Sequence, residues 1–196
     1  MKPTESPLWA RFTPKGVADT DANLLYEAAL QVPDGGLILE IGSFKGSSTY
    51  ALVLGAQGRN VKVHAVDTWM GSPGGLKEWP YGPAYTIDEF KHNLKEMLEN
   101  GTVIMHEMSS AGAYMIEPPL KPNLIFIDGS HQYEDVLFDV TFWWERLQPN
   151  GVVALHDCLD HPNAPTGPKR AVDLFISRHE VASCEVKGWI TWLRKP

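Results

Sequence analysis

Cysteine is scarce in this sequence of 196 residues, which contains only Cys158 and Cys184. Two cysteines without a CxxC spacing make no disulfide framework, so we expect a reducing, cytoplasmic setting. Long apolar stretches are missing as well, since no run approaches the roughly 20 residues that a membrane-spanning helix requires. The first residues also lack the apolar segment of a signal peptide. We therefore expect neither export nor a membrane partner.

Positive charge is also in short supply. The chain has 17 lysines and arginines against 24 acidic residues, which gives a net charge of −7, and no basic cluster exceeds a pair. Binding to a nucleic-acid backbone needs a basic stripe, so we expect no DNA or RNA partner. The hydrophobic content of 43% is ordinary for a globular protein, and this length suits one domain.

The N-terminal residues differ from the rest in their content of proline and glycine. Pro3, Pro7, Pro14 and Gly16 predict an irregular arm over residues 1–19. Residues 20–196 then form a single domain, since the sequence shows no internal repeat and no low-complexity tract. Its first helix is expected to be capped by Asp21.

Short apolar runs alternate with helical patterns along the domain. The expected strands are 37–41, 61–66, 103–106, 124–127 and 151–155, and the expected helices are 47–54, 87–98, 133–147 and 169–179. The chain ends differently, with two apolar runs at 183–186 and 189–193 around Lys187-Gly188, which predicts a hairpin. Continuously apolar strands that alternate with helices indicate an α/β fold with a parallel sheet covered on both faces.

Ligands of such sheets bind beyond the carboxyl ends of the strands. The first strand leads into a turn with Gly42 and Gly46, where the backbone can approach a ligand closely and present free N–H groups. The alternative is a turn that only packs strand on helix. The dinucleotide fingerprint GxGxxG is absent, because Ser43 and Phe44 replace its middle glycine, and this disfavours a nicotinamide cofactor.

An acidic residue, Asp67, ends the second strand. There it can accept hydrogen bonds from both hydroxyls of a ribose, or it can simply cap the next turn. Glu40 lies at the end of the first strand, with the glycine loop following it, and the two acids together favour a nucleoside ligand.

Two further strands end in acidic and histidine residues. Asp128 and His131 follow the run 124–127, and His156 and Asp157 follow the run 151–155. These two carboxylates and two imidazoles are expected to converge, where they can hold a divalent cation or perform acid–base chemistry. The alternative is that both aspartates merely cap helices.

Four stretches carry a family resemblance: Glu-Ile-Gly-Ser-Phe-Lys-Gly-Ser-Ser-Thr, Val-Asp-Thr-Trp, Ile-Asp-Gly-Ser-His and the later His-Asp. In this order they resemble class I S-adenosylmethionine-dependent methyltransferases, in the branch with macrocin O-methyltransferase-like and cephalosporin-hydroxylase-like proteins. The resemblance implies a Rossmann-like, mostly parallel seven-stranded sheet with an antiparallel C-terminal strand. It also implies S-adenosyl-L-methionine as cofactor and methyl transfer to a small-molecule acceptor.

The resemblance assigns cofactor contacts residue by residue. Ser48 matches a position that holds the cofactor carboxylate, Asp67 the ribose-binding acid, and Asp128 the acid near the cofactor amino group. Trp69 is expected beside the adenine and Ser109 near its amino group. The cofactor-binding set implied by the family is Glu40, Gly42, Ser43, Gly46, Ser48, Asp67, Trp69, Ser109 and Asp128.

The same resemblance bears on a metal ion. In metal-using relatives Asp128 and Asp157 match two ligands of a divalent cation such as Mg²⁺. The third ligand position is Cys158 here, and a thiol is a poor ligand for Mg²⁺. The sequence therefore predicts a weak site completed by water, or none.

The catalytic base has two candidates. His131 matches the position of a lysine base in catechol O-methyltransferase-like members. His156 directly precedes Asp157 in the chain, and strand alternation predicts that these two side chains point to opposite faces. If Asp157 faces the site, His156 is a structural residue packed against a helix, and His131 is the base, with Asp157 orienting the acceptor.

The sequence thus predicts an O-methyltransferase whose acceptor is covered by residues 70–85 and 159–168, which are rich in Gly, Pro and aromatic residues. Two alternatives remain open at this point. A non-catalytic binder of S-adenosylmethionine or an interaction protein would need neither His131 nor His156. A nicotinamide-dependent oxidoreductase is opposed by the missing glycine and by the antiparallel end.

Overall fold

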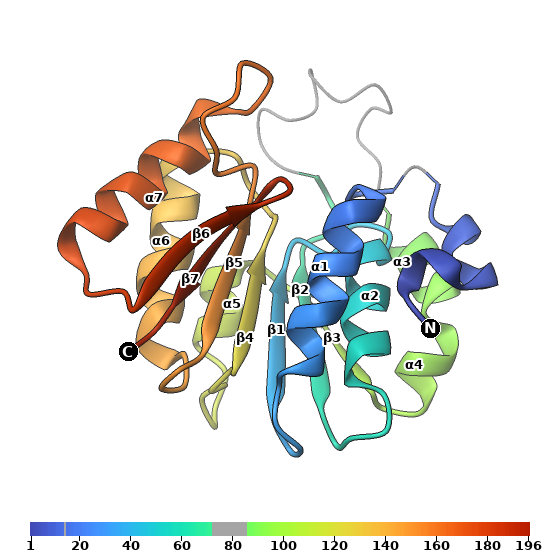
Figure 1. The fold of residues 1–196 in the computed structure, drawn as a ribbon. Coiled ribbons are helices and arrows are strands. Elements are labelled where there is room, and N and C mark those ends of the chain that lie inside the picture. Colours follow the sequence, from blue (N-terminus) through green and yellow to red (C-terminus); the bar gives the residue numbers. More distant parts are fainter. Residues whose placement is uncertain (14, 72–85) are drawn as a thin grey trace.

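The structure of the chain is a computed structural model that describes residues 1–13, 15–71 and 86–196. One seven-stranded sheet runs through the described residues in the order β3-β2-β1-β4-β5-β7-β6, with helices on both faces (Figure 1). The strands are β1 (Leu37–Ile41), β2 (Lys62–Asp67), β3 (Val103–Glu107), β4 (Leu124–Ile127), β5 (Val152–His156), β6 (Ser183–Lys187) and β7 (Ile190–Arg194).

The helices pack in two layers. One layer lies over β1, β2 and β3, and the other lies over β4 and β5 on the opposite face (Figure 1). The first layer has α1 (Asp19–Leu30), α2 (Ser47–Ala56), α3 (Ile87–Asn93) and α4 (Lys95–Glu99), and the second has α5 (Ser110–Tyr114), α6 (Tyr133–Arg146) and α7 (Thr166–Arg178). No helix in residues 1–13, 15–71 and 86–196 is long and apolar enough to span a bilayer.

Strands β1 to β5 pair in parallel, whereas β7 is antiparallel to both of its neighbours, β5 and β6. The chain reverses at Gly188, whose φ of 61° lies in the left-handed region that favours glycine. This confirms the predicted Rossmann-like sheet with an antiparallel C-terminal strand. It also brings the turn between β6 and β7 to the edge at which β5 ends, because Ile190 pairs with His156.

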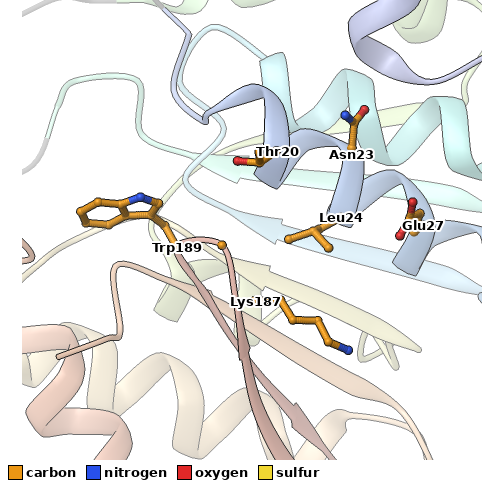
Figure 2. Close-up of a pocket in the computed structure, with 7 residues that line it drawn as sticks. Thr20, Asn23, Leu24, Glu27, Lys187 and Trp189 are labelled. Carbon is orange, nitrogen blue, oxygen red and sulfur yellow. The ribbon is translucent and has the colours of Figure 1, made fainter. Parts of the chain in front are cut away.

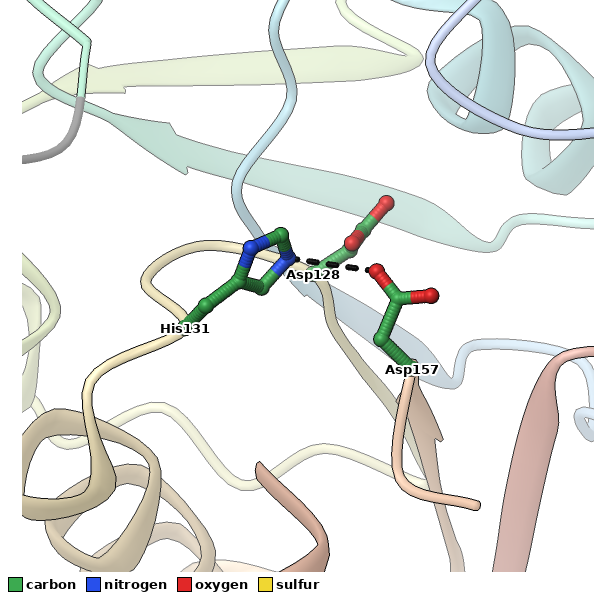
Figure 3. Close-up of side chains that lie close together, drawn as sticks. All are labelled: Asp128, His131 and Asp157. Carbon is green, nitrogen blue, oxygen red and sulfur yellow. Dashed lines mark ion pairs between the residues drawn. The ribbon is translucent and has the colours of Figure 1, made fainter. Parts of the chain in front are cut away.

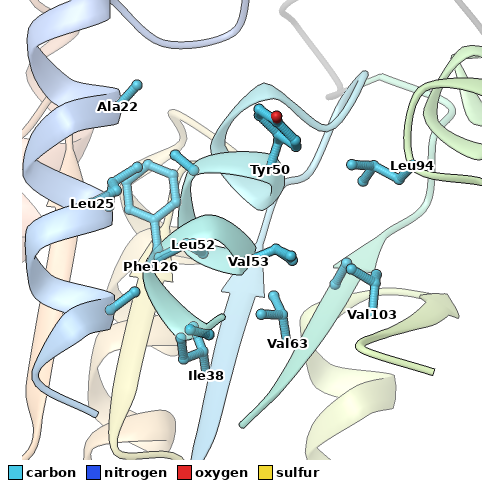
Figure 4. Close-up of a cluster of buried hydrophobic side chains, with 14 of the residues drawn as sticks. Ala22, Leu25, Ile38, Tyr50, Leu52, Val53, Val63, Leu94, Val103 and Phe126 are labelled. Atoms are coloured by element: carbon cyan, nitrogen blue, oxygen red, sulfur yellow. The ribbon is translucent and has the colours of Figure 1, made fainter. Parts of the chain in front are cut away.

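Two hydrophobic clusters hold the layers to the sheet. The first joins α1 and α2 to one face, where Leu25, Leu52 and Phe126 are inaccessible to solvent (Figure 4). The second joins α6 and α7 to the other face through Trp143 and Phe175. Burying a side chain of this size contributes roughly 1.5–3 kcal/mol, so the sheet is a rigid base for the loops at its carboxyl edge.

The N-terminal residues contain two short 3-10 helices, Pro3–Glu5 and Pro7–Arg11, where the sequence predicted an irregular arm. Trp9 and Phe12 are almost fully buried in the first cluster. The division between an arm over residues 1–19 and a domain over 20–196 stays a prediction.

The predicted cap of α1 is wrong. Ala18 is the N-cap, and Asp21 lies inside the first turn with its side chain fully buried. Its carboxylate binds no amide of its own helix and instead meets the turn between β6 and β7. The sequence near Asp21 suggested a helix cap, whereas its hydrogen-bond donor is Trp189 N, more than 160 residues away in the sequence.

Two helices differ from the sequence pattern. The expected helix over 87–98 is divided at Leu94 into α3 and α4, since Leu94 leaves helical geometry and turns its side chain into the core. The short helix α5 was not predicted. Ser109 caps it, with its hydroxyl accepting a hydrogen bond from Gly112 N at 3.1 Å.

Candidate active site

The predicted site residues meet at the carboxyl edge of the sheet. Register places the ends of β1, β2, β4 and β5 side by side, because Glu40 pairs with Phe126 and Ile127 pairs with Leu155. Parallel strands present their carboxyl ends at one edge, and the residues following them form the site. The two sides of that edge have different chemistry.

The glycines after β1 are required by backbone geometry and by close packing. Gly42 and Gly46 have φ values of 88° and 91°, which side-chain-bearing residues rarely adopt. A Cβ at Gly42 would lie 2.2 Å from the carbonyl oxygen of Asp128, and one at Gly46 would lie 2.7 Å from Leu94. The loop is therefore pressed against the start of the segment after β4, which brings Glu40 and Asp128 into one site.

Glu40 is a fully buried acid surrounded by hydroxyl groups. Its Oε2 accepts a hydrogen bond from Ser43 Oγ at 2.8 Å and a second from Thr49 Oγ1. Burial raises the pKa of Glu40 to about 7, although the neighbouring hydroxyl groups of Ser48, Thr49 and Ser43 oppose the shift. The other oxygen, Oε1, is buried and has no partner among the described residues, which leaves an acceptor for an additional donor.

Asp67 fastens the glycine loop to β2. Its Oδ2 accepts hydrogen bonds from the backbone N–H groups of Ser43 at 2.8 Å and Phe44 at 2.9 Å. Its Oδ1 accepts from Trp69 N at 2.7 Å. These three bonds use three of the roughly four lone-pair positions of a carboxylate. Asp67 therefore has a position left for one ribose hydroxyl, and accepting from both hydroxyls would require it to share or exchange a bond that it makes in this structure.

Two predicted adenine neighbours have packing or capping roles here. The Trp69 ring is 1% exposed, packs against Phe90 with ring centroids 4.9 Å apart, and donates from Nε1 to Phe44 O at 2.8 Å. In this conformation the ring has no free face, so the structure does not place it where a base could stack. Ser109 is exposed at the start of α5.

The other side of the edge is a cluster of charged groups. Asp128, His131 and Asp157 each turn one polar atom toward the others, and these atoms lie within 4.8 Å of one another (Figure 3). His131 Nε2 is 3.2 Å from Asp157 Oδ2. The His131 side chain is 46% exposed, against 16% for Asp128 and 17% for Asp157. Of these three groups, His131 is therefore the one that solvent and an acceptor reach most readily.

His156 joins the cluster, which corrects the expectation that it points away from Asp157. Its Nδ1 lies 3.3 Å from Asp157 Oδ2 and 3.3 Å from Asp128 Oδ1, although neither contact has the alignment of a hydrogen bond. Strand alternation fails here because Asp157 has a φ of 58° and leaves the strand direction. On its other side His156 Nε2 faces Asp21 Oδ2 of α1 at 3.4 Å, so the ring does pack against a helix as predicted.

The cluster shifts the proton affinities of its members. The hydrogen bond to Asp157 raises the pKa of His131, and burial opposes that shift. Burial would lower the pKa of His156, but the facing carboxylates, Asp128 first, outweigh it and raise that pKa well above its usual range. Burial would raise the pKa of Asp157, but its contacts with His131 and His156 outweigh burial and hold that pKa far below the usual value.

These contacts decide how well a metal ion fits. Cys158, which occupies the third ligand position implied by the family, is buried and donates from Sγ to His156 O at 3.2 Å. Burial raises the pKa of its thiol, so it offers no thiolate. The oxygens of Asp128 and Asp157 that converge already face imidazole nitrogens. Asp128, His131 and Asp157 each offer one ligand atom to a divalent cation, and Cys158 adds no thiolate to them.

A cavity of about 550 Å³ lies next to the site and not over it. It is formed between α1 and the turn that joins β6 and β7, and Trp189 borders it (Figure 2). The main chain of Trp189 is fixed to the site, because its carbonyl oxygen accepts a hydrogen bond from Asp157 N at 2.9 Å. Its ring contacts His161 edge to face, with centroids 4.9 Å apart.

This strand order, with an acid ending β2 and the chain reversed in β7, is that of the class I S-adenosylmethionine-dependent methyltransferases. A family model described as a methyltransferase domain matches residues 39–158, which is more than half of the chain, and the chain belongs to that family. The matched segment extends from β1 to Cys158 and so includes both sides of the site.

Solved structures show the same fold at low sequence identity. The O-methyltransferase NovP superimposes with a TM-score of 0.73 at 16% identity, over 91% of this chain and 81% of that one. An O-methyltransferase from Bacillus cereus in complex with SAH gives 0.67 at 18%, over 97% and 92%. TomG from Streptomyces achromogenes, solved with SAM, gives 0.67 at 17%, over 98% and 91%.

Proposed function

We propose that this methyltransferase transfers the methyl group of S-adenosylmethionine to a hydroxyl oxygen of a small-molecule acceptor, with His131 as the general base. The observation that carries the proposal is the pair formed by His131 and Asp157, with Nε2 of the histidine 3.2 Å from the carboxylate. With a hydrogen on Nε2 facing the Asp157 carboxylate, the second ring nitrogen, Nδ1, is left to accept a proton.

The residues beside the glycine loop fit the cofactor. Glu40 Oε1 is buried and without a partner in the described part of the chain, so it can accept from the ammonium group of S-adenosylmethionine. Asp128 lies close enough to Glu40 to raise its pKa, so both acids face that ammonium group. The cofactor supplies a methyl group on a sulfonium, which needs no further activation.

The transfer itself is a single displacement. The bond between the methyl carbon and sulfur breaks as the bond to the acceptor oxygen forms, and S-adenosylhomocysteine leaves with the electron pair. The acceptor proton passes to His131 Nδ1, and the resulting imidazolium is stabilised by Asp157. The chain's own contribution is alignment of the reactants together with this proton transfer.

The acceptor is expected on the exposed side of His131. The segment 159–168, which follows Cys158, is proposed as part of the cover of the acceptor, and its His161 contacts the Trp189 ring beside the site. The other predicted cover, residues 70–85, lies outside the described residues except for Met70 and Gly71. The reducing, cytoplasmic setting remains a proposal, in line with two free thiols.

The test follows the label from ¹³C-methyl S-adenosylmethionine through a panel of phenols and sugar hydroxyls. This panel is chosen because relatives of this fold include a TDP-rhamnose 3'-O-methyltransferase. We expect the label on oxygen in at least one product. Label appearing only on nitrogen or sulfur acceptors would overturn O-methylation.

We further propose that transfer needs no tightly held metal ion, since the cluster leaves at most a weak site completed by water at Asp128 and Asp157. Activity should persist after exhaustive chelation, and elemental analysis of the untreated protein should show less than one bound cation per chain. Loss of activity on chelation, restored by one divalent cation, would contradict this.

A further inference from the structure

Asp21 is a buried carboxylate that the proposed reaction does not use. It lies in the first turn of α1, and its side chain is inaccessible to solvent. Burying an ionised carboxylate is costly unless it is paired and hydrogen-bonded. The groups that pair with it therefore indicate why it is there.

Both oxygens of Asp21 have partners from the far end of the chain. Oδ1 accepts a hydrogen bond from Trp189 N at 3.1 Å, and Oδ2 faces His156 Nε2 at 3.4 Å. Gly188 permits this approach, because a Cβ at that position would lie 2.0 Å from Asp21 Oδ1. The turn is thus built to admit the carboxylate.

The His156 ring connects Asp21 to the two acids of the site. Its Nε2 is hydrogen-bonded to Asp21, and its Nδ1 lies 3.3 Å from both Asp128 Oδ1 and Asp157 Oδ2, a charge contact without the alignment of a hydrogen bond. A carboxylate oxygen can only accept, so Nε2 must carry a hydrogen when it meets Asp21. Turning the ring over would place carbon atoms against the acids, so the contact with Asp21 selects one orientation of the ring.

A second connection passes through the main chain of Trp189. Its N–H donates to Asp21, and its carbonyl oxygen accepts from Asp157 N at 2.9 Å. Asp157 has a positive φ of 58°, which aspartate tolerates better than most residues but which its surroundings help to hold. The turn that Asp21 anchors is one of those surroundings.

We propose that Asp21 is a positioning residue of the methyltransferase, which fixes the carboxylates of Asp128 and Asp157 through the His156 ring and through the main chain of Trp189. Asp157 in turn orients His131. The inference rests on the proposed function, because a positioned acid–base pair matters only if the site transfers a proton. The alternative is that Asp21 only fastens α1 to the β6–β7 hairpin.

The experiment compares Asp21→Asn with Glu27→Gln, which removes a negative charge from an exposed position of the same helix. With an acceptor found by the label assay, Asp21→Asn should lower kcat roughly 10- to 100-fold, the order of magnitude lost when an outer-shell partner of a metal site is removed. The Kd for S-adenosylhomocysteine and the KM for the acceptor should change less than about threefold. Glu27→Gln should change none of these values.

A double-mutant cycle separates positioning from simple fastening. If Asp21 acts through His156, then adding Asp21→Asn to His156→Asn should lower kcat by less than Asp21→Asn alone lowers it. Losses in kcat that multiply in the double variant would overturn the route through the His156 ring. A folded Asp21→Asn enzyme with kcat within twofold of the unsubstituted enzyme would overturn the proposal.

A measurement on the unsubstituted protein covers the case in which Asp21→Asn does not fold. In a ¹H–¹⁵N spectrum of histidine-labelled protein, the Nε2–H of His156 should appear as a resonance protected from exchange with solvent. Its absence would overturn the proposal. This measurement needs neither cofactor nor acceptor, so failure of the methyltransferase assignment and failure of the Asp21 inference can be told apart.

Discussion

The two sides of the carboxyl edge satisfy their acids by different means. Beside β1 and β2, Glu40 is surrounded by hydroxyl groups and Asp67 by backbone N–H groups, all neutral donors. Beside β4 and β5, Asp128 and Asp157 face the imidazoles of His131 and His156. Hydroxyl and backbone N–H donors do not titrate near neutral pH, whereas the exposed imidazole of His131 can take up a proton from an acceptor. The first side is suited to binding and the second to proton transfer.

Among the substitutions that test this difference between the two sides, His131→Ala is expected to have the largest effect on turnover. Replacement by alanine should lower turnover roughly 10²–10⁴-fold, because the acceptor proton loses its base. His92→Ala, on the exposed side of α3, is the matched control and should leave turnover unchanged. If His131→Ala retains normal turnover while His156→Ala, still folded, loses it, the base has been assigned to the wrong histidine.

A smaller effect is expected in the pH dependence of turnover. The base must be neutral to accept a proton, and the hydrogen bond to Asp157 raises the pKa of His131 above 6.5. Turnover should therefore rise with pH and level off at a higher pH than an unperturbed histidine would give. Asp157→Asn removes the bond that causes the shift, so its profile should level off at lower pH. An Asp157→Asn profile with an unmoved or higher midpoint would show that this pair does not set the titration.

The smallest effect concerns stability outside the site. Burial raises the pKa of Asp139 in α6 from 3.8 to about 7. Between those values the folded state holds a proton that the unfolded state releases, so this group lowers the free energy of unfolding as pH rises through that window. Asp139→Asn should therefore raise the melting temperature above that of the unsubstituted protein by more at pH 8 than at pH 5. The difference should be about 2–4 °C for each kcal/mol of unfolding free energy. Thermal unfolding at both pH values gives the difference, and an equal effect at both would contradict it.

Periodic patterns predicted most of the fold. The bounds of β1, β4 and β5 were predicted to within one or two residues, because a short, continuously apolar run that alternates with helices is typical of a buried parallel strand. The break at Leu94 was not predicted, since both halves of the segment bear the same helical pattern. Helix α5 is only five residues long, which is too short for a periodic pattern to be distinctive.

Local rules failed where distant residues meet. Asp21 was expected to cap a helix because its sequence position allowed it, yet its partners are Trp189 and His156. Strand alternation predicted that the side chains of His156 and Asp157 point to opposite faces. The positive φ of Asp157 turns its side chain out of that pattern. In each case the deciding contact comes from tertiary structure that the neighbouring sequence does not report.

Titration calorimetry with S-adenosylhomocysteine tests most directly whether one side binds and the other reacts. We expect the unsubstituted protein to bind S-adenosylhomocysteine and to bind NAD more weakly or not at all. His131→Ala should bind S-adenosylhomocysteine within a few fold of the unsubstituted protein. Asp67→Ala should bind it more weakly by on the order of 1.5–3 kcal/mol for each charge-assisted hydrogen bond lost. Tighter binding of NAD, or equal losses in His131→Ala and Asp67→Ala, would contradict the account.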